Sequence, residues 1–206
     1  LPVPGADLDG VLYLRTLDHS GELARRAESA TRAVVIGGGF IGLEVAAALR
    51  MLGKQVTVLE AADRLMGRVV APIISTFYAD LHRARGAELV LDARIEGLAG
   101  KDGRVSAVVM ADGTRHEADL VVIGIGVLPN VELAEAAGLA CANGIVVDEQ
   151  GRTSDPAIYA AGECTSHPNR FAGGFARLES VQNAVDQAKA VATSILGRPA
   201  AYDEVP

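Results

Sequence analysis

Residues 33–60 read AVVIGGGFIGLEVAAALRMLGKQVTVLE, and this stretch decides the fold of the chain. An apolar run leads into the motif Gly37-x-Gly39-x-x-Gly42, an alanine-rich helical pattern follows, and a second apolar run ends on Glu60. In such a unit the first glycine permits a tight turn, the second lets backbone approach a pyrophosphate, and the third allows close packing of helix and strand. The helix N-terminus offers free N–H groups and a positive dipole end to the phosphates.

A glycine triplet alone is weak evidence, because such triplets also occur in plain turns. Here a strand, the glycines, a helix, a second strand and an acid follow one another in register. Glu60 lies 18 residues beyond Gly42, where a carboxylate can accept hydrogen bonds from both ribose hydroxyls. The stretch therefore predicts a βαβ unit that binds a dinucleotide.

The composition agrees with an α/β protein of one large or two modest domains. Half of the 206 residues are hydrophobic and 22% are charged, so a sizeable core can form. The longest uncharged runs, near residues 33–43 and 120–131, contain glycines and are too short to span a bilayer. The net charge of −7 gives no support to a nucleic-acid partner. We therefore expect neither a membrane nor a nucleic acid as partner.

The cysteines and histidines show no pattern of a metal or redox site. Cys141 and Cys164 form neither a CxxC motif nor a ligand cluster, and we expect two reduced thiols in a cytoplasmic protein. The four histidines are scattered without HxxxH spacing, so no metal site is expected. No basic and then apolar leader opens the chain, and no secretory signal is expected.

The rest of the chain alternates strands and helices. Besides the βαβ unit, the expected strands are at residues 10–14, 87–91, 119–126, 145–147 and 158–161, and the expected helices at 18–30, 72–85, 132–137 and 180–196. Asp-Gly pairs near residues 102 and 112 indicate tight hairpin turns of an antiparallel insert. The helix at 72–85 carries apolar residues at helical spacing, which we expect to face the core: Ile73, Ile74, Phe77 and Leu81.

Four motifs occur in the order found in flavoproteins that bind two dinucleotides. They are GGGFIGLE at 37–44, GIGVLPN at 124–130, TSDPAIYAAGE at 153–163 and RLESVQNA at 177–184. The chain resembles the FAD-dependent pyridine nucleotide-disulfide oxidoreductase superfamily, in particular the putidaredoxin reductase-like branch of ferredoxin reductases that serve oxygenases and P450s. The resemblance covers nearly all of the chain. It implies an α/β fold with a Rossmann-like NAD-binding domain (a parallel sheet plus the antiparallel insert) and the returning part of a FAD-binding domain.

The resemblance also implies a division of the chain into three segments. Residues 1–27 would be a crossover from the FAD domain, residues 28–127 the NAD(H)-binding domain, and residues 128–206 the C-terminal part of the FAD-binding domain. Members of this family carry two GxGxxG units, and the context of the single unit here matches the internal one, which binds NAD(P)H. We therefore interpret the chain as an internal segment of a longer flavoprotein.

On the NAD(H) side, the resemblance assigns cofactor binding to Gly37, Gly38, Gly39, Phe40, Ile41, Gly42, Gly124, Ile125 and Gly126. Glu60 would hold the adenosine ribose, and because a carboxylate repels a 2′-phosphate, NADH is expected over NADPH. Arg64 and Arg68 could reach the adenosine ribose or the phosphates, or be solvated surface arginines. An arginine can also serve a 2′-phosphate.

Glu44 resembles the family glutamate that hydrogen-bonds the nicotinamide amide, and it is the one candidate for the catalytic site. The alternative is a carboxylate that complements the helix N-terminus without touching a ligand. A bare acid inside an otherwise apolar face needs a partner, which favours the nicotinamide role.

On the flavin side, the resemblance assigns Arg15, Gly162, Glu163 and Val181. Arg15 matches an arginine that contacts FAD, and Val181 matches the helix start that meets the flavin pyrimidine. Glu163 stands where the family usually has aspartate, so its extra methylene must retract or shift the flavin slightly. Residues 180–183 can also be interpreted simply as a helix cap, and the two interpretations are compatible.

These assignments imply hydride transfer from NADH to FAD, followed by single electrons to a ferredoxin-type iron–sulfur protein of an oxygenase or P450 system. The protein would supply alignment and electrostatics, and the cofactors the chemistry. The alternatives are the NADH–flavin component of a rubredoxin or nitrite reductase, and a non-catalytic NAD-binding fragment. A nucleotide domain without CxxC argues against the thioredoxin reductase type. The sequence leaves a homo-oligomer open.

Overall fold

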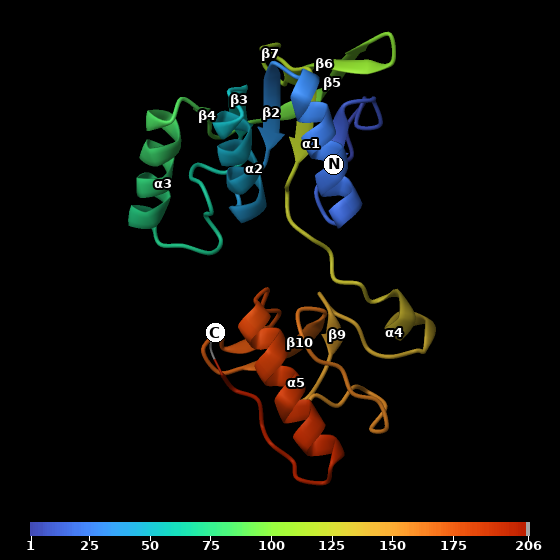
Figure 1. Ribbon diagram of the computed structural model, residues 1–206. Helices are drawn as coiled ribbons and strands as arrows, with labels where there is room; N and C mark the ends of the chain where they lie inside the picture. Colours follow the sequence, from blue (N-terminus) through green and yellow to red (C-terminus); the bar gives the residue numbers. More distant parts are fainter. Residues whose placement is uncertain (205–206) are drawn as a thin grey trace. The chain divides into compact units, whose positions relative to one another are not determined.

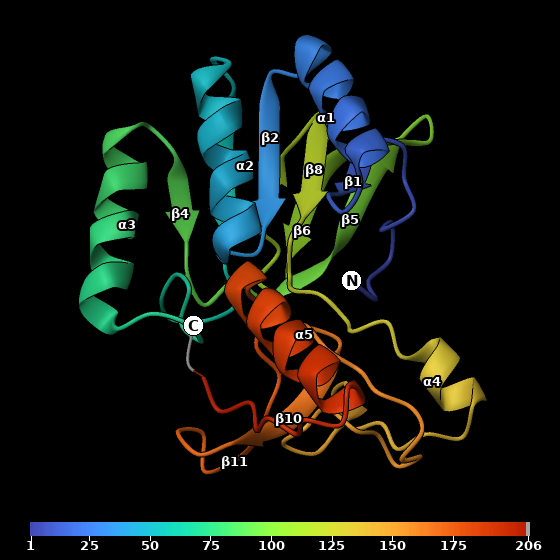
Figure 2. The ribbon, with the colours of Figure 1, turned by 60° about the horizontal axis from the view of Figure 1, so that its bottom comes forward.

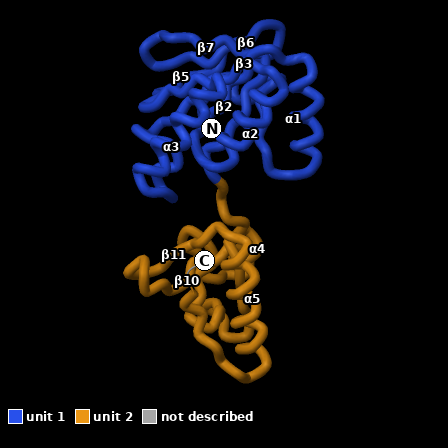
Figure 3. The backbone as a smooth tube through the Cα atoms, turned by 60° about the vertical axis from the view of Figure 1, so that its left-hand side comes forward, with its two compact units in different colours: residues 1–126 blue, residues 127–206 orange. Residues whose placement is uncertain are grey.

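The computed structural model describes residues 1–204, and the chain divides into two compact units (Figure 3). Unit 1 is Leu1–Gly126 and unit 2 is Val127–Pro206. Residues 1–27 contribute a strand and a helix to unit 1, and their assignment to a FAD-domain crossover stays a prediction. None of the helices in residues 1–204 combines the length and the apolar character needed to cross a bilayer.

Unit 1 is built on a five-stranded parallel sheet with the order β1-β8-β2-β3-β4 (Figure 1). Its strands are β1 (Val11–Tyr13), β2 (Arg32–Ile36), β3 (Gln55–Leu59), β4 (Glu88–Val90) and β8 (Leu120–Ile123). Its helices are α1 (Leu17–Ser29), α2 (Phe40–Met51) and α3 (Pro72–Ala84). The predicted βαβ unit is β2-α2-β3, and the structure confirms it.

The two faces of this sheet are covered differently (Figure 2). Val35, Val58 and Val122 pack in one core cluster with α1 and α2. Their strand neighbours Val34 and Val121 point to the other face and pack against an antiparallel sheet. Because both faces are buried, the central strands carry continuous apolar runs, residues 33–36 in β2 and Leu120–Ile123 in β8, rather than an alternating pattern, as expected of a parallel sheet.

The antiparallel sheet is the predicted insert. It consists of β5 (Ile95–Lys101), β6 (Arg104–Met110) and β7 (Arg115–Glu117), in that order. Asp102 and Gly103 both have positive φ, 51° and 78°, as a two-residue Asp-Gly hairpin turn requires. The prediction of an antiparallel insert is therefore confirmed.

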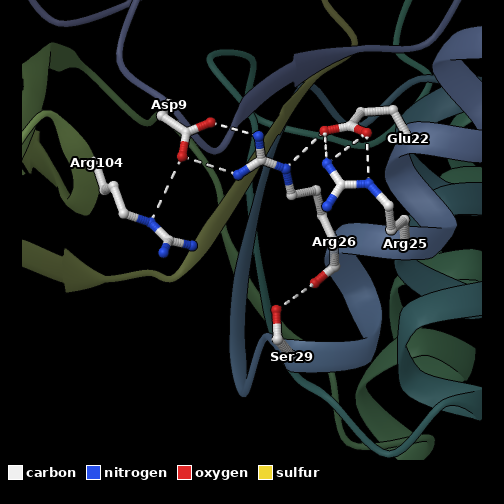
Figure 4. Close-up of polar contacts among 6 residues, drawn as sticks. All are labelled: Asp9, Glu22, Arg25, Arg26, Ser29 and Arg104. Atoms are coloured by element: carbon white, nitrogen blue, oxygen red, sulfur yellow. Dashed lines mark hydrogen bonds and ion pairs between the residues drawn. The ribbon is translucent and has the colours of Figure 1, made fainter.

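An ion-pair network links α1 to Asp9, in the segment that precedes β1, and to β6 (Figure 4). Arg26 donates to both carboxylate oxygens of Asp9 and to Glu22, and Glu22 also accepts from Arg25. Arg104 reaches Asp9 from β6 at 3.5 Å. The Arg26 hydrogen bonds lower the pKa of Asp9. Since the network is largely exposed, it contributes to register and orientation more than to net stability.

The prediction that the apolar stripe of α3 faces the core is wrong. The exposed fractions are 77% for Ile73, 41% for Ile74, 60% for Phe77 and 38% for Leu81. The buried residues of α3 are instead Ser75, Ala79 and His82. The Ser75 hydroxyl donates to the Leu65 carbonyl at 2.6 Å, which fixes the rotation of the helix so that the face with Ser75, Ala79 and His82 packs inward.

In residues 127–204, unit 2 contains a three-stranded sheet and two helices. The elements are α4 (Glu132–Ala136), β9 (Ile145–Val146), β10 (Thr165–Asn169), β11 (Gly174–Ala176) and α5 (Val181–Ile195), with the strand order β11-β10-β9. The predicted strand at 158–161 is wrong, since only Tyr159 forms an isolated bridge, to Arg152. The central strand is β10, whose sequence TSHPN gives no apolar pattern.

The interior of unit 2 is polar, and α5 satisfies most of it. Gln187, which is 1% exposed, accepts through its Oε1 from the Gly162 N–H and from the Thr165 hydroxyl. The Asn183 side chain accepts from the Tyr202 hydroxyl at 2.8 Å and donates to the Leu178 carbonyl. These contacts explain why a strand of polar residues is buried, because a buried polar group is tolerated when it is hydrogen-bonded.

His167 is the exception in this interior. It is 2% exposed, and neither ring nitrogen has a hydrogen-bond partner among the described residues. Its ring packs edge-on against Tyr202, with 5.4 Å between the ring centroids. Burial lowers the pKa of His167 below its ordinary value.

Replacement of His167 by Phe should therefore stabilise unit 2, because the buried orphan nitrogens are removed and the aromatic contact is kept. We expect a gain of about 1 kcal/mol or more at neutral pH. Because burial lowers the pKa of His167, the unfolded wild-type chain binds a proton at this position more readily than the folded chain below a pH of about 6.5, so wild-type stability falls with decreasing pH.

The stability difference between variant and wild type should grow as the pH falls from 7 toward 5, by at most about 1.4 kcal/mol per pH unit. Denaturant unfolding at a series of pH values measures it, with His19→Phe, at an exposed position of α1, as the matched control. A constant difference across that range would contradict the prediction.

Candidate functional site

The glycine loop after β2 is shaped by contacts between backbones. Gly37 has a φ of 109°, and a Cβ there would overlap the carbonyl oxygen of Gly124 at the end of β8. A Cβ on Gly42 would overlap the carbonyl oxygen of Gly37. Glycine at these positions thus lets the first turn of α2 lie directly against the ends of β2 and β8.

Gly39 lies in a different environment. It is the N-cap of α2, with a φ of −82° and no side-chain cap, and a Cβ there would have no atom within 4 Å. The first intrahelical bond runs from the Leu43 N–H to Gly39, so the preceding N–H groups of the first turn have no partner in the helix. Open space in front of free N–H groups at a helix N-terminus suits a phosphate.

Glu60 is held by the same loop. Its Oε2 accepts from the Gly38 N–H at 2.5 Å and its Oε1 from the Ala62 N–H at 2.8 Å. Each carboxylate oxygen keeps a lone pair for a further donor. Glu60, which directly follows β3, therefore lies beside the glycine loop. The two backbone N–H groups orient its carboxylate, which can still accept a hydrogen bond from a ligand hydroxyl.

The remaining predicted residues of unit 1 lie at the carboxyl edge of the parallel sheet. Phe40, Ile41 and Ile125 border the glycine loop with exposed fractions of 56%, 38% and 49%. Since Tyr13 of β1 pairs with Ile123 of β8, Arg15 follows its strand at this same edge. The edge thus combines free N–H groups, a carboxylate and exposed apolar side chains, which is a mixed lining suited to a small organic ligand.

Glu44 is exposed, as are Ala47 and Ala48 on the same helix. The expectation that it lies within an apolar face is therefore wrong, because the buried residues of α2 lie on the other side of the helix: Gly42, Leu43, Val45, Ala46 and Leu49. Its position in the second turn still places a negative charge near the helix N-terminus, and its role at the nicotinamide stays a prediction.

The two arginines beyond Glu60 differ. The Arg64 guanidinium donates to the carbonyls of Gly67 and Val70 and to the Ser75 hydroxyl. Arg68 is exposed, and its side chain has no hydrogen bond or ion pair to another residue in the range 1–204. Its Nη2 lies 3.3 Å from the position of a Cβ on Gly126, so Arg68 extends over the end of β8.

Unit 2 groups its predicted residues around the start of α5. Gly162 has a φ of 92°, and a Cβ there would lie 3.6 Å from Ala184 of α5. Glu163 follows it and is exposed. Val181 is the first residue of α5, 83% exposed, and Ser180 caps the helix by accepting from the Asn183 N–H.

Sequence reasoning missed Gln187 and Tyr202, which fix this arrangement from a distance. Gln187 holds the Gly162 N–H, and Tyr202 holds Asn183 in the first turn of α5. A glutamine at a buried position of an amphipathic helix was a signal in the sequence, whereas Tyr202 gave none. In the part of the chain that the structure describes, no group of three or more His, Cys, Asp or Glu residues could hold a metal ion.

Comparisons with known proteins agree with this geometry. A family model described as pyridine nucleotide-disulphide oxidoreductase matches residues 1–188. Rhodocoxin reductase of Rhodococcus erythropolis is 47% identical over 206 residues, which are 100% of this chain and 48% of that protein. The chain spans about half the length of the curated relatives that it matches.

Solved structures show the same similarity. The ferredoxin reductase for the CYP199A2 system of Rhodopseudomonas palustris is 48% identical with a TM-score of 0.96, over 100% of this chain and 51% of that one. The covalent putidaredoxin reductase–putidaredoxin complex matches at 42% identity and a TM-score of 0.91, over 99% of this chain and 50% of that one.

Replacement of Gly39 by Val should abolish dinucleotide binding and leave the fold intact. The position accepts a side chain without strain or overlap, and the side chain would fill the space in front of the free N–H groups. Calorimetric titration with NADH measures binding, and circular dichroism and thermal unfolding report on the fold.

Gly21→Val is the matched control, because Gly21 lies in α1 and a Cβ there also meets nothing within 4 Å. It should bind as the wild type does. A Gly39→Val variant that is folded and binds NADH normally would show that the loop is not the site.

Proposed function

The chain belongs to the pyridine nucleotide-disulphide oxidoreductase family, and from this we propose that it forms the NADH-binding part of a flavoprotein reductase that delivers electrons to a ferredoxin-type iron–sulfur protein. The observation that carries the proposal is the uncapped N-terminus of α2, open in front of Gly39, with the Glu60 carboxylate held beside it by the Gly38 N–H. In this arrangement the pyrophosphate meets the helix N-terminus and the adenosine ribose meets Glu60.

In this proposal residues 28–127 form the NAD(H)-binding domain, and residues 1–27 and 128–206 belong to the FAD-binding domain. Bound FAD would accept a hydride and release electrons singly. The residues of this chain suited to hold it are Arg15, Gly162, Glu163 and the start of α5 at Val181. The fit rests on the left-handed Gly162 and on the N–H groups of the first turn of α5, which can stabilise a negative charge on the ligand.

The proposed work of the chain is alignment. The glycine loop fixes the phosphates, Glu60 fixes the ribose, and the exposed apolar edge of Phe40, Ile41 and Ile125 excludes water from the nicotinamide half. Glu44 would hold the nicotinamide amide through a hydrogen bond from the amide N–H to its carboxylate. No side chain is required as a nucleophile.

An iron–sulfur protein is the proposed electron acceptor because the similar reductases named above serve ferredoxin-type partners. Rubredoxin is the alternative acceptor raised by the sequence. The proposal includes a cytoplasmic location, where free thiols such as Cys141 and Cys164 persist.

NADH should bind at least about tenfold more tightly than NADPH, because the Glu60 carboxylate accepts ribose hydroxyls and repels a phosphate dianion. Glu60→Gln removes the charge, and its amide nitrogen cannot accept from one of the two backbone N–H groups that Glu60 holds, so NADH affinity should fall. Because the repulsion of a 2′-phosphate is lost, the ratio of NADH affinity to NADPH affinity should also fall. Calorimetric titration of both nucleotides tests this. Tighter binding of NADPH to the wild type would overturn the role of Glu60.

The electron-transfer function is tested in a chimera in which residues 1–206 replace the matching segment of rhodocoxin reductase. We expect the chimera to be yellow and to reduce a ferredoxin with NADH faster than it reduces rubredoxin. The chain by itself, with its single glycine motif, should stay colourless. A chimera that carries Gly39→Val should retain FAD and lose turnover with NADH. A folded yellow chimera that does not oxidise NADH would refute the proposed function.

A further inference from the structure

The segment that follows Glu60 is closed on itself by one side chain. Arg64 donates from Nη1 to the Val70 carbonyl at 2.8 Å and to the Ser75 hydroxyl at 2.9 Å, and from Nη2 to the Gly67 carbonyl. A planar guanidinium can serve acceptors in several directions at once, which an ammonium group cannot do in the same geometry. Arg64 thus binds the two ends of residues 64–70 to each other and to α3.

This closed segment rests on the glycine loop at two points. The Met66 N–H donates to the Gly38 carbonyl at 3.0 Å, and Met66 adopts a positive φ of 50° to do so. Leu65, which is 1% exposed, packs so tightly on Gly38 that a Cβ there would lie 2.6 Å from its Cδ2. The Leu65 carbonyl is in turn held by Ser75, the hydroxyl that accepts from Arg64.

Gly38 is consequently held on both sides. Its N–H is fixed by Glu60 and its carbonyl by Met66. A shift of residues 64–70 would therefore move the peptide that precedes Gly39, which lies in front of the open N-terminus of α2. The same segment carries Arg68, the arginine of the pair whose guanidinium has no acceptor among the described residues.

We propose that Arg64 is a positioning residue of the nucleotide site: it makes no contact with the nucleotide, but closes residues 64–70 so that Gly38 is fixed and Arg68 is presented over Gly126. This inference rests on the proposed function, since it names how the NADH site is organised. It separates the two arginines, because the Arg64 guanidinium is already engaged by protein acceptors and only Arg68 is available for a ligand anion.

The test uses the 206-residue chain and NADH. Binding is measured by calorimetry, and the hydrogen exchange of individual amides by NMR. The variants are Arg64→Ala, Arg64→Lys and Arg68→Ala, and Arg94→Ala, at an exposed position of unit 1, is the matched control.

Arg64→Ala should lower NADH affinity by about tenfold or more, because a small displacement of a positioning element is costly to binding. It should also speed the exchange of the Gly38 amide, while the amides of Val34 and Val35 in β2 keep their protection. Arg64→Lys should restore affinity only in part, and methylguanidinium added at millimolar concentration should restore the binding of Arg64→Ala. Arg68→Ala should leave Gly38 exchange unchanged whatever it does to affinity.

Three results would overturn the inference. Normal NADH affinity in Arg64→Ala excludes a positioning role, and reduced affinity with normal Gly38 exchange indicates direct contact instead. Loss of protection in β2 as well as at Gly38, without rescue by methylguanidinium, indicates general destabilisation. If the wild-type chain does not bind NADH, the proposed function fails, and Gly38 exchange in Arg64→Ala still decides whether Arg64 fixes the loop.

Discussion

The structure of unit 1 depends on a contact between backbones that is too close to admit a side chain at Gly37 or Gly42. Gly42, at the start of α2, lies against the carbonyl of Gly37, and Gly37 lies against that of Gly124. Three chain segments thereby meet at the end of β2 at a distance that a methyl group would prevent. This contact fixes the direction of α2 relative to the sheet, and with it the direction of the free N–H groups at its start. Glu60 and the closed segment held by Arg64 both contact the loop that this geometry shapes, through the N–H and the carbonyl of Gly38.

Unit 2 is organised in the opposite manner, by side chains that reach into a polar interior. Gln187 accepts hydrogen bonds from Gly162 and Thr165, and Asn183 accepts one from Tyr202. Side chains of α5 thus hold residues that precede the helix in the chain and a residue that follows it. Such a core favours one arrangement of its side chains, because the loss of any hydrogen-bonding partner leaves a buried polar group without a hydrogen bond. The two units should therefore respond differently to substitution: unit 1 to added atoms at Gly37 and Gly42, and unit 2 to lost hydrogen bonds.

The elements of unit 1 could be predicted from the sequence because their signals are local. The apolar runs, the glycine motif and the Asp-Gly turns each determine structure within a few residues, and β2-α2-β3 and the β5–β6 hairpin follow from them. The orientation of α3 could not be predicted, since a hydrogen bond from Ser75 to a distant carbonyl decides which face packs inward. The polar strand β10 was missed because its burial depends on α5, which follows it in the chain.

The same limit holds for the site. Residue types at motif positions identified the glycine loop and Glu60, whose places in the structure are as the motif suggests. Spacing alone could not distinguish Arg64 from Arg68, because only the folded loop shows which guanidinium is engaged.

The sheet order β1-β8-β2-β3-β4 has a further consequence for a chain emerging from the ribosome. β2, β3 and β4 can assemble as they appear, but β1 has no strand partner until β8 arrives from the far end of unit 1, and closing so long a loop is slow. The first strand of unit 1 is thus the last to be completed, and since Gly124 follows β8, a ligand present during translation would meet a finished loop only at that final step.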